Sequence, residues 1–511
     1  MRRFSELGFR ERSGFVLAAL AFLGAGFGLQ DSLSYPARWT LGVALAMAVL
    51  WITESIPLWA TALLPLLLYP LFGVSSVGDL LLEYFDPINF MFLGGMWLAA
   101  SLEEWNVHHR MALGMVARIG VSPRRIVLGF MVTTAFISLW ISNTAAAVML
   151  FPIGMAVLRE FREQPGATAQ DVKRLGLTLM LGIGYAASIG GIGCKIGTGT
   201  NLVFVKQSAQ VLSHEVSFLN WFKIGLPVLL LALPLSWLYL VRVAAPLPGE
   251  PIPGAKELIA QRRAALGRMS RGEIMASLGF GGAGFLWIFR QEMDFGLFRI
   301  PGWNALVPDR WTTFGASFPE PLKGLLGPRG AESVIAMSMA LLLMLLPAGG
   351  GRQVLSLKAA SRISWGLLLL LGGGFAMAKG ITDSGLSKVL TQSLTDIHGV
   401  SPLVALIAIC LFTTAMSEVA SNTATASILL PVLASAAPHL GLSAGTAMFA
   451  ATLSASFGFM LPAGTPPNAV VFSSGYIPVT AMVKAGLVVD IVGAIVIAVV
   501  CYYVAPWALG Y

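Results

Sequence analysis

Two short polar motifs stand inside otherwise apolar stretches of the sequence. They are Ser142, Asn143 and Thr144 in ISNTAAAVMLFP, and Ser421, Asn422 and Thr423 in ASNTATASILLP. Each motif offers two hydroxyls and one amide, neutral groups that can donate hydrogen bonds to a carboxylate or present oxygen to a small hard cation. A helix that begins directly after such a motif directs backbone N–H groups and the positive end of its dipole at an anion. The motifs therefore predict binding of an anion, a small cation or both.

A glycine-containing segment follows each motif further along the chain. GTGTN runs from Gly197 to Asn201, and GTPPN runs from Gly464 to Asn468. Glycine allows close approach of the backbone to a ligand, and the two prolines of the second segment end a helix and free upstream carbonyls. Freed carbonyls with Ser and Asn oxygens suit an alkali cation, which would attract an anion bound beside it. A phosphate-binding loop fits poorly, because no Lys-Ser/Thr pair follows and no parallel strand precedes.

These motifs belong to an internal repeat. The two Ser-Asn-Thr motifs align without a gap at an offset of 421 − 142 = 279, and at that offset Gly94 and Gly95 fall on Gly373 and Gly374. GTGTN matches GTPPN at an offset of 464 − 197 = 267. One such motif alone would more often serve helix packing. Interrupted apolar segments at corresponding places in two halves instead favour the midplane binding site of inverted-repeat secondary transporters.

Three ionisable residues lie close to these breaks. Lys195 precedes Gly197 by two residues, where its ammonium could attract a dianion, take the place of a cation, or extend to water. Glu54 and Glu418 are acids in apolar surroundings, and we expect them to make structural hydrogen bonds near the breaks.

The composition excludes a soluble protein. Of the 511 residues, 56% are hydrophobic and 11% are charged, against roughly a quarter charged in a soluble domain. The net charge of 33 − 25 = +8 comes from cations between apolar runs, so it indicates membrane orientation and not nucleic-acid binding. The three cysteines are odd in number and far apart, which argues against a disulfide framework or a thiolate metal site.

Hydropathy predicts membrane spans along the whole chain, starting with a retained N-terminal helix preceded by cytoplasmic arginines. Uninterrupted spans are expected near 13–30, 38–55, 57–73, 88–106, 110–120, 218–242, 273–290, 332–347, 364–382 and 481–505. Interrupted stretches are expected at 124–159, 175–207, 402–437 and 444–474. The basic segment 244–272 is placed in the cytoplasm, and the polar segment 291–330 on the opposite side.

At these motifs the sequence resembles the divalent anion/sodium symporter family, which includes bacterial dicarboxylate transporters and mammalian sodium-coupled dicarboxylate and citrate carriers. The resemblance runs through WITESIPLWATALLP, FLGGMWLA, SLWISNTAAAVMLFPI, SNTATASILLPV and FMLPAGTPPNAVVF. It implies an all-α polytopic membrane protein of about 11 transmembrane helices plus two re-entrant helical hairpins. It also implies inverted repeats, a homodimer in the bacterial inner membrane, and a transport domain that moves against a scaffold as an elevator.

The resemblance also implies a set of binding residues. A first sodium ion would meet Ser138, Ser142, Asn143 and the backbone of Gly197, and a second would meet Ser417, Ala420, Asn422 and the backbone of Gly464. Substrate carboxylates would meet Ser142, Asn143, Thr144, Thr198, Ser421, Asn422, Thr423, Thr465 and Pro466, with Asn89 as an addition. Lys195 departs from the uncharged residue usual in similar sequences, and in some members of the family, which are sodium-independent exchangers, basic side chains replace the cation.

The expected domain organisation follows the repeat. First-repeat scaffold helices occupy 1–120, the first hairpin and broken helix 121–210, scaffold helices with the linker 211–292, and an extracytoplasmic loop 293–330. Second-repeat scaffold helices occupy 331–400, the second hairpin and broken helix 401–478, and the last transmembrane helix 479–511.

The leading functional hypothesis is sodium-coupled import of C4-dicarboxylates such as succinate, malate or fumarate, with sodium as a co-transported ion. A sodium-independent dicarboxylate exchanger is the second, and a permease or channel-like pore for sulfate or another oxyanion is the third. A membrane enzyme is the least favoured, because no nucleophile–base pair, metal cluster or acid pair occurs in the breaks.

Overall fold

The computed structural model describes most of the chain. Its described residues are 8–120, 122–163, 168–212, 216–249, 260–261, 263–290, 293–294, 299–303, 328–386, 389, 400–462 and 464–510. Part of the predicted cytoplasmic segment 244–272 and most of the predicted extracytoplasmic loop 293–330 lie outside these residues.

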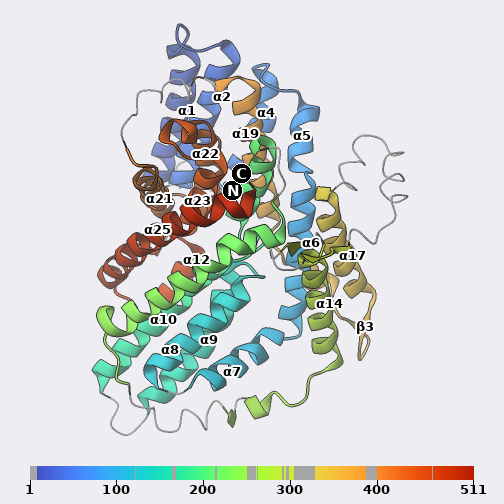
Figure 1. The fold of residues 1–511 in the computed structure, drawn as a ribbon, viewed down its shortest axis with the longest axis vertical. Coiled ribbons are helices and arrows are strands. Elements are labelled where there is room, and N and C mark those ends of the chain that lie inside the picture. The colour runs from blue at the N-terminus through green and yellow to red at the C-terminus, as the bar shows by residue number, and fades with distance from the viewer. Residues whose placement is uncertain are drawn as a thin grey trace.

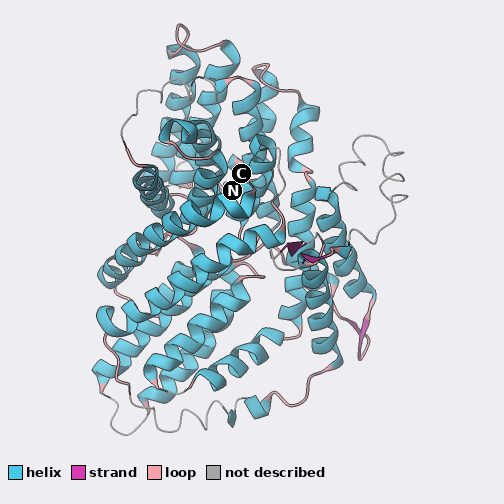
Figure 2. Ribbon diagram, viewed as in Figure 1, coloured by secondary structure: helices cyan, strands magenta, loops and turns pink. Residues whose placement is uncertain are grey.

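The first repeat is built almost entirely from helices (Figures 1 and 2). Before the first motif come α1 (Phe9–Gly28), α2 (Tyr35–Thr53), α3 (Leu58–Thr61), α4 (Leu64–Leu71), α5 (Val77–Tyr84), α6 (Pro87–Glu104), α7 (Val107–Ile119) and α8 (Pro123–Ser138). After it come α9 (Asn143–Arg162), α10 (Ala169–Gly191), α11 (Gly199–Leu212), α12 (Phe218–Tyr239) with a π-helical turn η2 (Leu240–Ala244), and α14 (Arg271–Ile288).

The second repeat is also helical. It contains α17 (Pro328–Leu345), α18 (Leu357–Ser361), α19 (Trp365–Asp383), α21 (Pro402–Val419), α22 (Asn422–Ala436), η4 (Ala437–Leu440), α23 (Ala444–Ser454), α24 (Pro466–Phe472) and α25 (Val479–Leu509). Two small antiparallel ribbons join β1 (Met293–Asp294) to β2 (Arg299–Ile300) and β3 (Pro347–Gly349) to β4 (Arg352–Gln353).

All four predicted interruptions are confirmed. One helix ends and another begins at each of them: α8 and α9, α10 and α11, α21 and α22, and α23 and α24. Two of the new helices have a side-chain cap, because Ser142 accepts from Ala145 N at 3.3 Å and Thr465 accepts from Asn468 N at 3.4 Å. Polar residues and glycines therefore divide these stretches as the sequence pattern indicates.

The prediction of one span at 57–73 is wrong, because α3 and α4 divide it. Pro65 supplies no N–H and fits the first turn of a helix, so a new helix starts at Leu64. The short helix α5 was not predicted, although Ser76 caps it by accepting from Asp79 N at 3.1 Å. Pro65 and the cap by Ser76 therefore determine where helices begin between residues 57 and 84, although hydropathy alone predicts one continuous span at 57–73.

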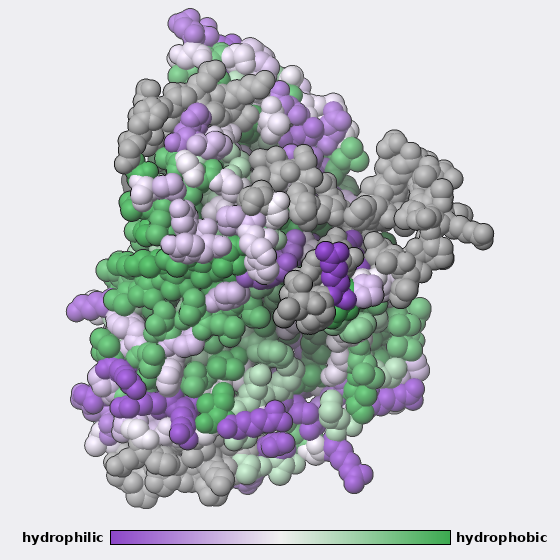
Figure 3. Space-filling view, in the orientation of Figure 1, coloured by the Kyte–Doolittle hydropathy of each residue, from purple (hydrophilic) through white to green (hydrophobic). Residues whose placement is uncertain are grey.

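Seven helices of the described chain are long and apolar enough to cross a membrane. They span 35–53, 143–162, 218–244, 365–383, 402–419, 422–440 and 479–509. The predicted total of about 11 stays a prediction. Apolar side chains cover a broad band of one face, and hydrophilic ones gather along the lower edge (Figure 3). Outward-facing Leu71, Leu278 and Leu345 are about three-quarters exposed, as residues that contact lipid would be.

The helices pack in groups that place the breaks at the centre. α10 lies against α8, α9 and α12, and α12 lies against α25 (Figure 1). Every residue of α10 from 178 to 191 is buried, as is every residue of α23 from 445 to 454. Because these parts of α10 and α23 are buried on all sides, the two helices belong to the core of the protein, and each ends at one of the breaks. α14 packs mainly on α17 and α6, and it also touches α12, where the rings of Phe218 and Trp287 stack with centroids 5.1 Å apart.

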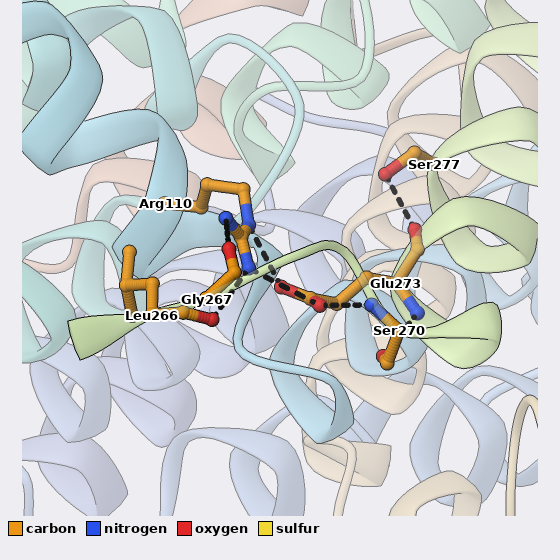
Figure 4. Close-up of polar contacts among 6 residues, drawn as sticks. All are labelled: Arg110, Leu266, Gly267, Ser270, Glu273 and Ser277. Carbon is orange, nitrogen blue, oxygen red and sulfur yellow. Dashed lines mark hydrogen bonds and ion pairs between the residues drawn. The ribbon is translucent and has the colours of Figure 1, made fainter. Parts of the chain in front are cut away.

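A network around Arg110 connects α7 to the start of α14 (Figure 4). Its guanidinium lies 3.0 Å from Glu273 Oε1 and donates to the carbonyls of Leu266 and Gly267 at 3.0 and 2.9 Å. Glu273 also accepts from Ser270 N at 2.6 Å, completing a capping box on α14. The charge pair therefore ties the described end of the linker to α7.

The paired glycines Gly94 and Gly373 each allow a close helix contact. A Cβ at Gly94 would lie 2.6 Å from the carbonyl carbon of Ala336 on α17, and one at Gly373 would lie 2.1 Å from the carbonyl oxygen of Ala62. The repeat thus uses the same position twice to bring backbones together.

Replacement of either glycine by alanine should lower the stability of the protein. We expect Gly94→Ala and Gly373→Ala each to cost about 1–3 kcal/mol, because a methyl group meets backbone that cannot move away. Thermal unfolding in detergent would measure this. Gly281→Ala is the matched control, since nothing lies within 4 Å of its Cβ position. Equal unfolding temperatures for all three variants would contradict the close-packing account.

Candidate functional site

The four breaks surround one cavity of about 640 Å³. Both Ser-Asn-Thr motifs and both glycine-containing segments contribute to its wall. The polar and backbone positions that line it are Ser142, Asn143, Thr144, Gly197, Thr198, Gly199, Ala420, Ser421, Asn422, Thr423, Gly464, Thr465 and Pro466. The two halves also touch, because a Cβ at Gly199 would lie 3.0 Å from Thr423 Oγ1. Motifs 279 positions apart and glycine-containing segments 267 positions apart therefore form a single site.

At the first break, Ser138 lies just behind the cavity wall. Its hydroxyl donates to the carbonyl of Ala187 at 2.6 Å and lies 3.0 Å from Asn143 Oδ1. A hydroxyl has one proton, so donation to the carbonyl leaves its lone pairs beside the amide oxygen. Two oxygens held together in this way suit a small cation between them.

The second break repeats this arrangement. Ser417 Oγ donates to the carbonyl of Ala455 at 2.5 Å and lies 2.9 Å from Asn422 Oδ1. Ser138 and Ser417 are both fully buried, so these contacts are shielded from solvent. The repeat therefore produces two oxygen pairs of the same geometry, one on each side of the cavity.

Asn201 and Asn468 hold the loops of the two breaks in place. Asn201 Nδ2 donates to the carbonyls of Gly191 and Cys194 at 2.9 and 2.8 Å, and Asn468 Nδ2 donates to those of Gly458 and Leu461 at 2.8 and 3.0 Å. Sequence reasoning gave these asparagines no role. The signal was present, because each is the last residue of its matched segment and the bonded carbonyls match at the same offset of 267.

Four helices begin at the cavity: α9 at Asn143, α11 at Gly199, α22 at Asn422 and α24 at Pro466. The first turn of each has N–H groups without partners inside the helix, and the helix dipole places partial positive charge there. The starts of these helices therefore favour negative charge beside the neutral hydroxyl and amide groups of the two motifs.

No Lys, Arg or His is among the described residues that line the cavity, and its two ionisable groups are acids. Glu418 makes the structural hydrogen bonds that were predicted, accepting from Met460 N at 2.7 Å and Leu461 N at 3.1 Å. Glu54 ends α2 in a left-handed conformation with φ 51°. A dianion here would meet no cationic side chain, so co-bound cations are needed to balance its charge.

Two sequence candidates lie elsewhere. Asn89 is buried and donates to the carbonyl of Tyr84 at 2.8 Å, outside the cavity wall.

Lys195 is 5% exposed, so it does not extend to water, and its ammonium lies 2.6 Å from Glu332 Oε2 on α17. Arg290 approaches the other oxygen of Glu332 at 3.6 Å. The structure thus gives Lys195 a carboxylate partner away from the cavity.

Lys206 on α11 forms a second buried ion pair. Its ammonium lies 3.1 Å from Glu83 and contacts Asp86, and all three side chains are at most 10% exposed. Together the two lysines connect the first broken helix to α17 and to the turn between α5 and α6. Their charges are matched by acids, which a buried ammonium requires.

A neighbouring cavity of about 470 Å³ shares Phe92, Ser142, Thr144 and Leu367 with the central one. It extends along α6 and α9, and Arg362 lies in its wall. The two cavities are therefore neighbours that share part of one wall.

Comparisons with known proteins agree with this architecture. The family model described as "Sodium:sulfate symporter transmembrane region" matches residues 15–509. Over 504 residues the chain is 37% identical to the sodium-dependent dicarboxylate transporter SdcS of Staphylococcus aureus strain NCTC 8325 / PS 47. That alignment covers 97% of this chain and 92% of the relative.

Two solved structures share the fold. MtrF of Neisseria gonorrhoeae matches with a TM-score of 0.56 and 13% identity, over 98% of this chain and 96% of its own. The YdaH transporter of Alcanivorax borkumensis matches with a TM-score of 0.53 and 14% identity, over 94% of this chain and 100% of its own. At these identities the likeness concerns the fold alone.

The two loop asparagines should be essential for ligand binding. We expect Asn201→Ala and Asn468→Ala each to raise the ligand concentration that gives half-maximal thermal stabilisation at least about tenfold. In each variant two carbonyls lose their donor, so the loop moves away from the cavity. Titration of the purified protein with sodium and succinate would measure this. Asn220→Ala, on α12 outside the loops, is the matched control. Parent-like titrations for both loop variants would refute the assigned role.

Proposed function

Because the chain belongs to the family of the sodium:sulfate symporter transmembrane region, we propose that it imports C4-dicarboxylates such as succinate, malate or fumarate together with sodium. The relative SdcS is named a sodium-dependent dicarboxylate transporter, which supports this substrate class. In this proposal sodium is a co-transported ion and the chain catalyses no chemical reaction.

One observation carries the proposal: the cavity has two matched oxygen pairs and no cationic side chain among its described lining residues. The first sodium ion would bind Ser138, Ser142, Asn143 and the backbone of Gly197. The second would bind Ser417, Ala420, Asn422 and the backbone of Gly464. Two monovalent cations balance a dianion, and their attraction for it across a water-poor cavity couples the two solutes.

The substrate would lie between the two motifs. Each of its carboxylates would accept hydrogen bonds from one motif, with Ser142, Asn143 and Thr144 on one side and Ser421, Asn422 and Thr423 on the other. Thr198, Thr465 and Pro466 would complete the wall. Neutral donors and helix N-termini hold the anion firmly enough for recognition but lack the fixed charge that would oppose its release.

For the translocation step we propose an elevator movement of the broken helices, with hairpins α8–α9 and α21–α22 re-entering the membrane. The chain would act as a homodimer in the bacterial inner membrane. In support, α12 packs mainly on α10 and α25, and α14 packs mainly on α6 and α17, with a smaller contact between α12 and α14, as two bodies that move against each other would do.

Uptake of labelled succinate into proteoliposomes tests the proposal. An inward sodium gradient would be compared with choline, each with and without dicarboxylate loaded inside. We expect uptake that requires sodium and is independent of the internal load. Uptake that requires internal dicarboxylate and ignores sodium would establish an exchanger instead. No uptake in either condition, with uptake of labelled sulfate, would establish an oxyanion permease.

The motif asparagines provide a sharper prediction. We expect Asn143→Ala and Asn422→Ala to lower sodium-driven succinate uptake at least about tenfold, equivalent to about 1.4 kcal/mol, because each removes one oxygen of a pair and a donor to the substrate. Membrane expression should stay near the parent level. Parent-like uptake in either variant would refute the site assigned to that half.

A further inference from the structure

A pair of buried acids lies directly behind the second break. Glu418 on α21 is 4% exposed and Asp490 on α25 is 3% exposed. Both lie beside the loop of the second break, because Glu418 Oε1 accepts from Met460 N at 2.7 Å and a Cβ at Gly486, one helical turn before Asp490, would lie 2.4 Å from the same nitrogen. Glu418 is held by the N–H groups of Met460 and Leu461. No donor lies in hydrogen-bonding geometry to either oxygen of Asp490. Within the described part of the chain, no Lys or Arg forms an ion pair with either acid.

The internal repeat shows what the fold itself requires at this place. Gly225 of α12 and Gly486 of α25 correspond, because each presses on the loop of its own break. A Cβ at Gly225 would lie 2.6 Å from the carbonyl oxygen of Ile192, and one at Gly486 would lie 2.4 Å from Met460 N. These two glycines are 486 − 225 = 261 positions apart in the sequence. At the same offset, Asp490 of the second half corresponds to Leu229 of the first half.

The first half has leucines where the second half has acids. The motif offset of 279 carries Glu418 back to Leu139. Leu139 and Leu229 meet at Gly193, since a Cβ there would lie 2.6 Å from one and 2.8 Å from the other. Gly193 is the counterpart of Met460 at the loop offset of 267. In the first half, two apolar side chains therefore fill the space behind the break. In the second half, two acids occupy the corresponding positions.

Two carboxylates without a cation are strongly unfavourable in a water-poor interior. Hard cations take oxygen ligands, and the negative charge of a carboxylate adds electrostatic attraction for the ion. A further oxygen lies nearby: the carbonyl of Phe459, which accepts from Tyr185 of α10 at 3.1 Å. We propose that Glu418 and Asp490 form an additional sodium site, separate from the two oxygen pairs at the motifs.

This site is mechanically connected to the central cavity. Glu418 lines that cavity, and a Cβ at Gly464 would lie 2.9 Å from its Oε2. The same carboxylate holds the loop that carries Gly464 and Thr465. A cation between the acids therefore fixes the loop in the position that the second motif needs, and ions at the two places bind cooperatively.

The inference rests on the proposed sodium coupling, and Asp490→Leu tests it by copying the first half of the repeat. Labelled sodium and labelled succinate would be counted in the same proteoliposomes. We expect the flux ratio to fall by one sodium ion per succinate, and the half-saturating sodium concentration to rise at least about fivefold. Asp490→Asn, which keeps the side-chain shape, should give the same loss and serves if the leucine variant does not fold.

Leu229→Met is the matched control, because it alters the corresponding position of the first half without adding or removing charge. It should keep the parent flux ratio. A sodium-dependent parent with an unchanged ratio in both Asp490 variants would overturn the additional site and leave the proposed function standing. A parent that transports without sodium would overturn both.

Discussion

Unpaired backbone groups in the membrane interior are the constraint on which this structure depends. Four helices are interrupted near the centre of the molecule, and each unpaired amide or carbonyl there would cost several kcal/mol. Buried side chains supply hydrogen-bond partners at the breaks. Asn201 and Asn468 donate to the loop carbonyls, and Ser138 and Ser417 donate to carbonyls at the ends of α10 and α23. Glu418 accepts from two backbone amides. Backbone at the four breaks also lines the cavity, where a bound ligand would contact it.

Charge is distributed according to the same constraint. The buried lysines nearest the first break, Lys195 and Lys206, have carboxylate partners on α17 and on the turn before α6. Because their charges are already balanced, they add little attraction for an anion in the cavity. The cavity instead has helix N-termini, hydroxyls, amides and two acids, a set that binds an anion only together with cations. The sequence alone could not decide this for Lys195, since its partner Glu332 lies 137 positions away.

The repeat makes function easier to separate from folding. Where both halves have the same residue in the same contact, as with Ser138 and Ser417 or Asn201 and Asn468, the contact serves the break itself. Where the halves differ, the fold tolerates either choice. Leu139 and Leu229 show that the position behind the break needs only apolar packing, so Glu418 and Asp490 stand out as an exception with a different purpose.

The sequence by itself determined the membrane class, the internal repeat, the four interruptions and twelve of the residues that line the cavity, because hydropathy and matched motifs are local patterns. It placed a single span at 57–73, where Pro65 starts a new helix, and it included Asn89, whose amide turns to Tyr84. Only the tertiary structure decided which side chains meet. The partners of Lys195, the packing of α12 with α25 and the pairing of Glu418 with Asp490 join residues far apart in the chain. Such contacts depend on how helices cross in space, which spacing along one chain does not specify.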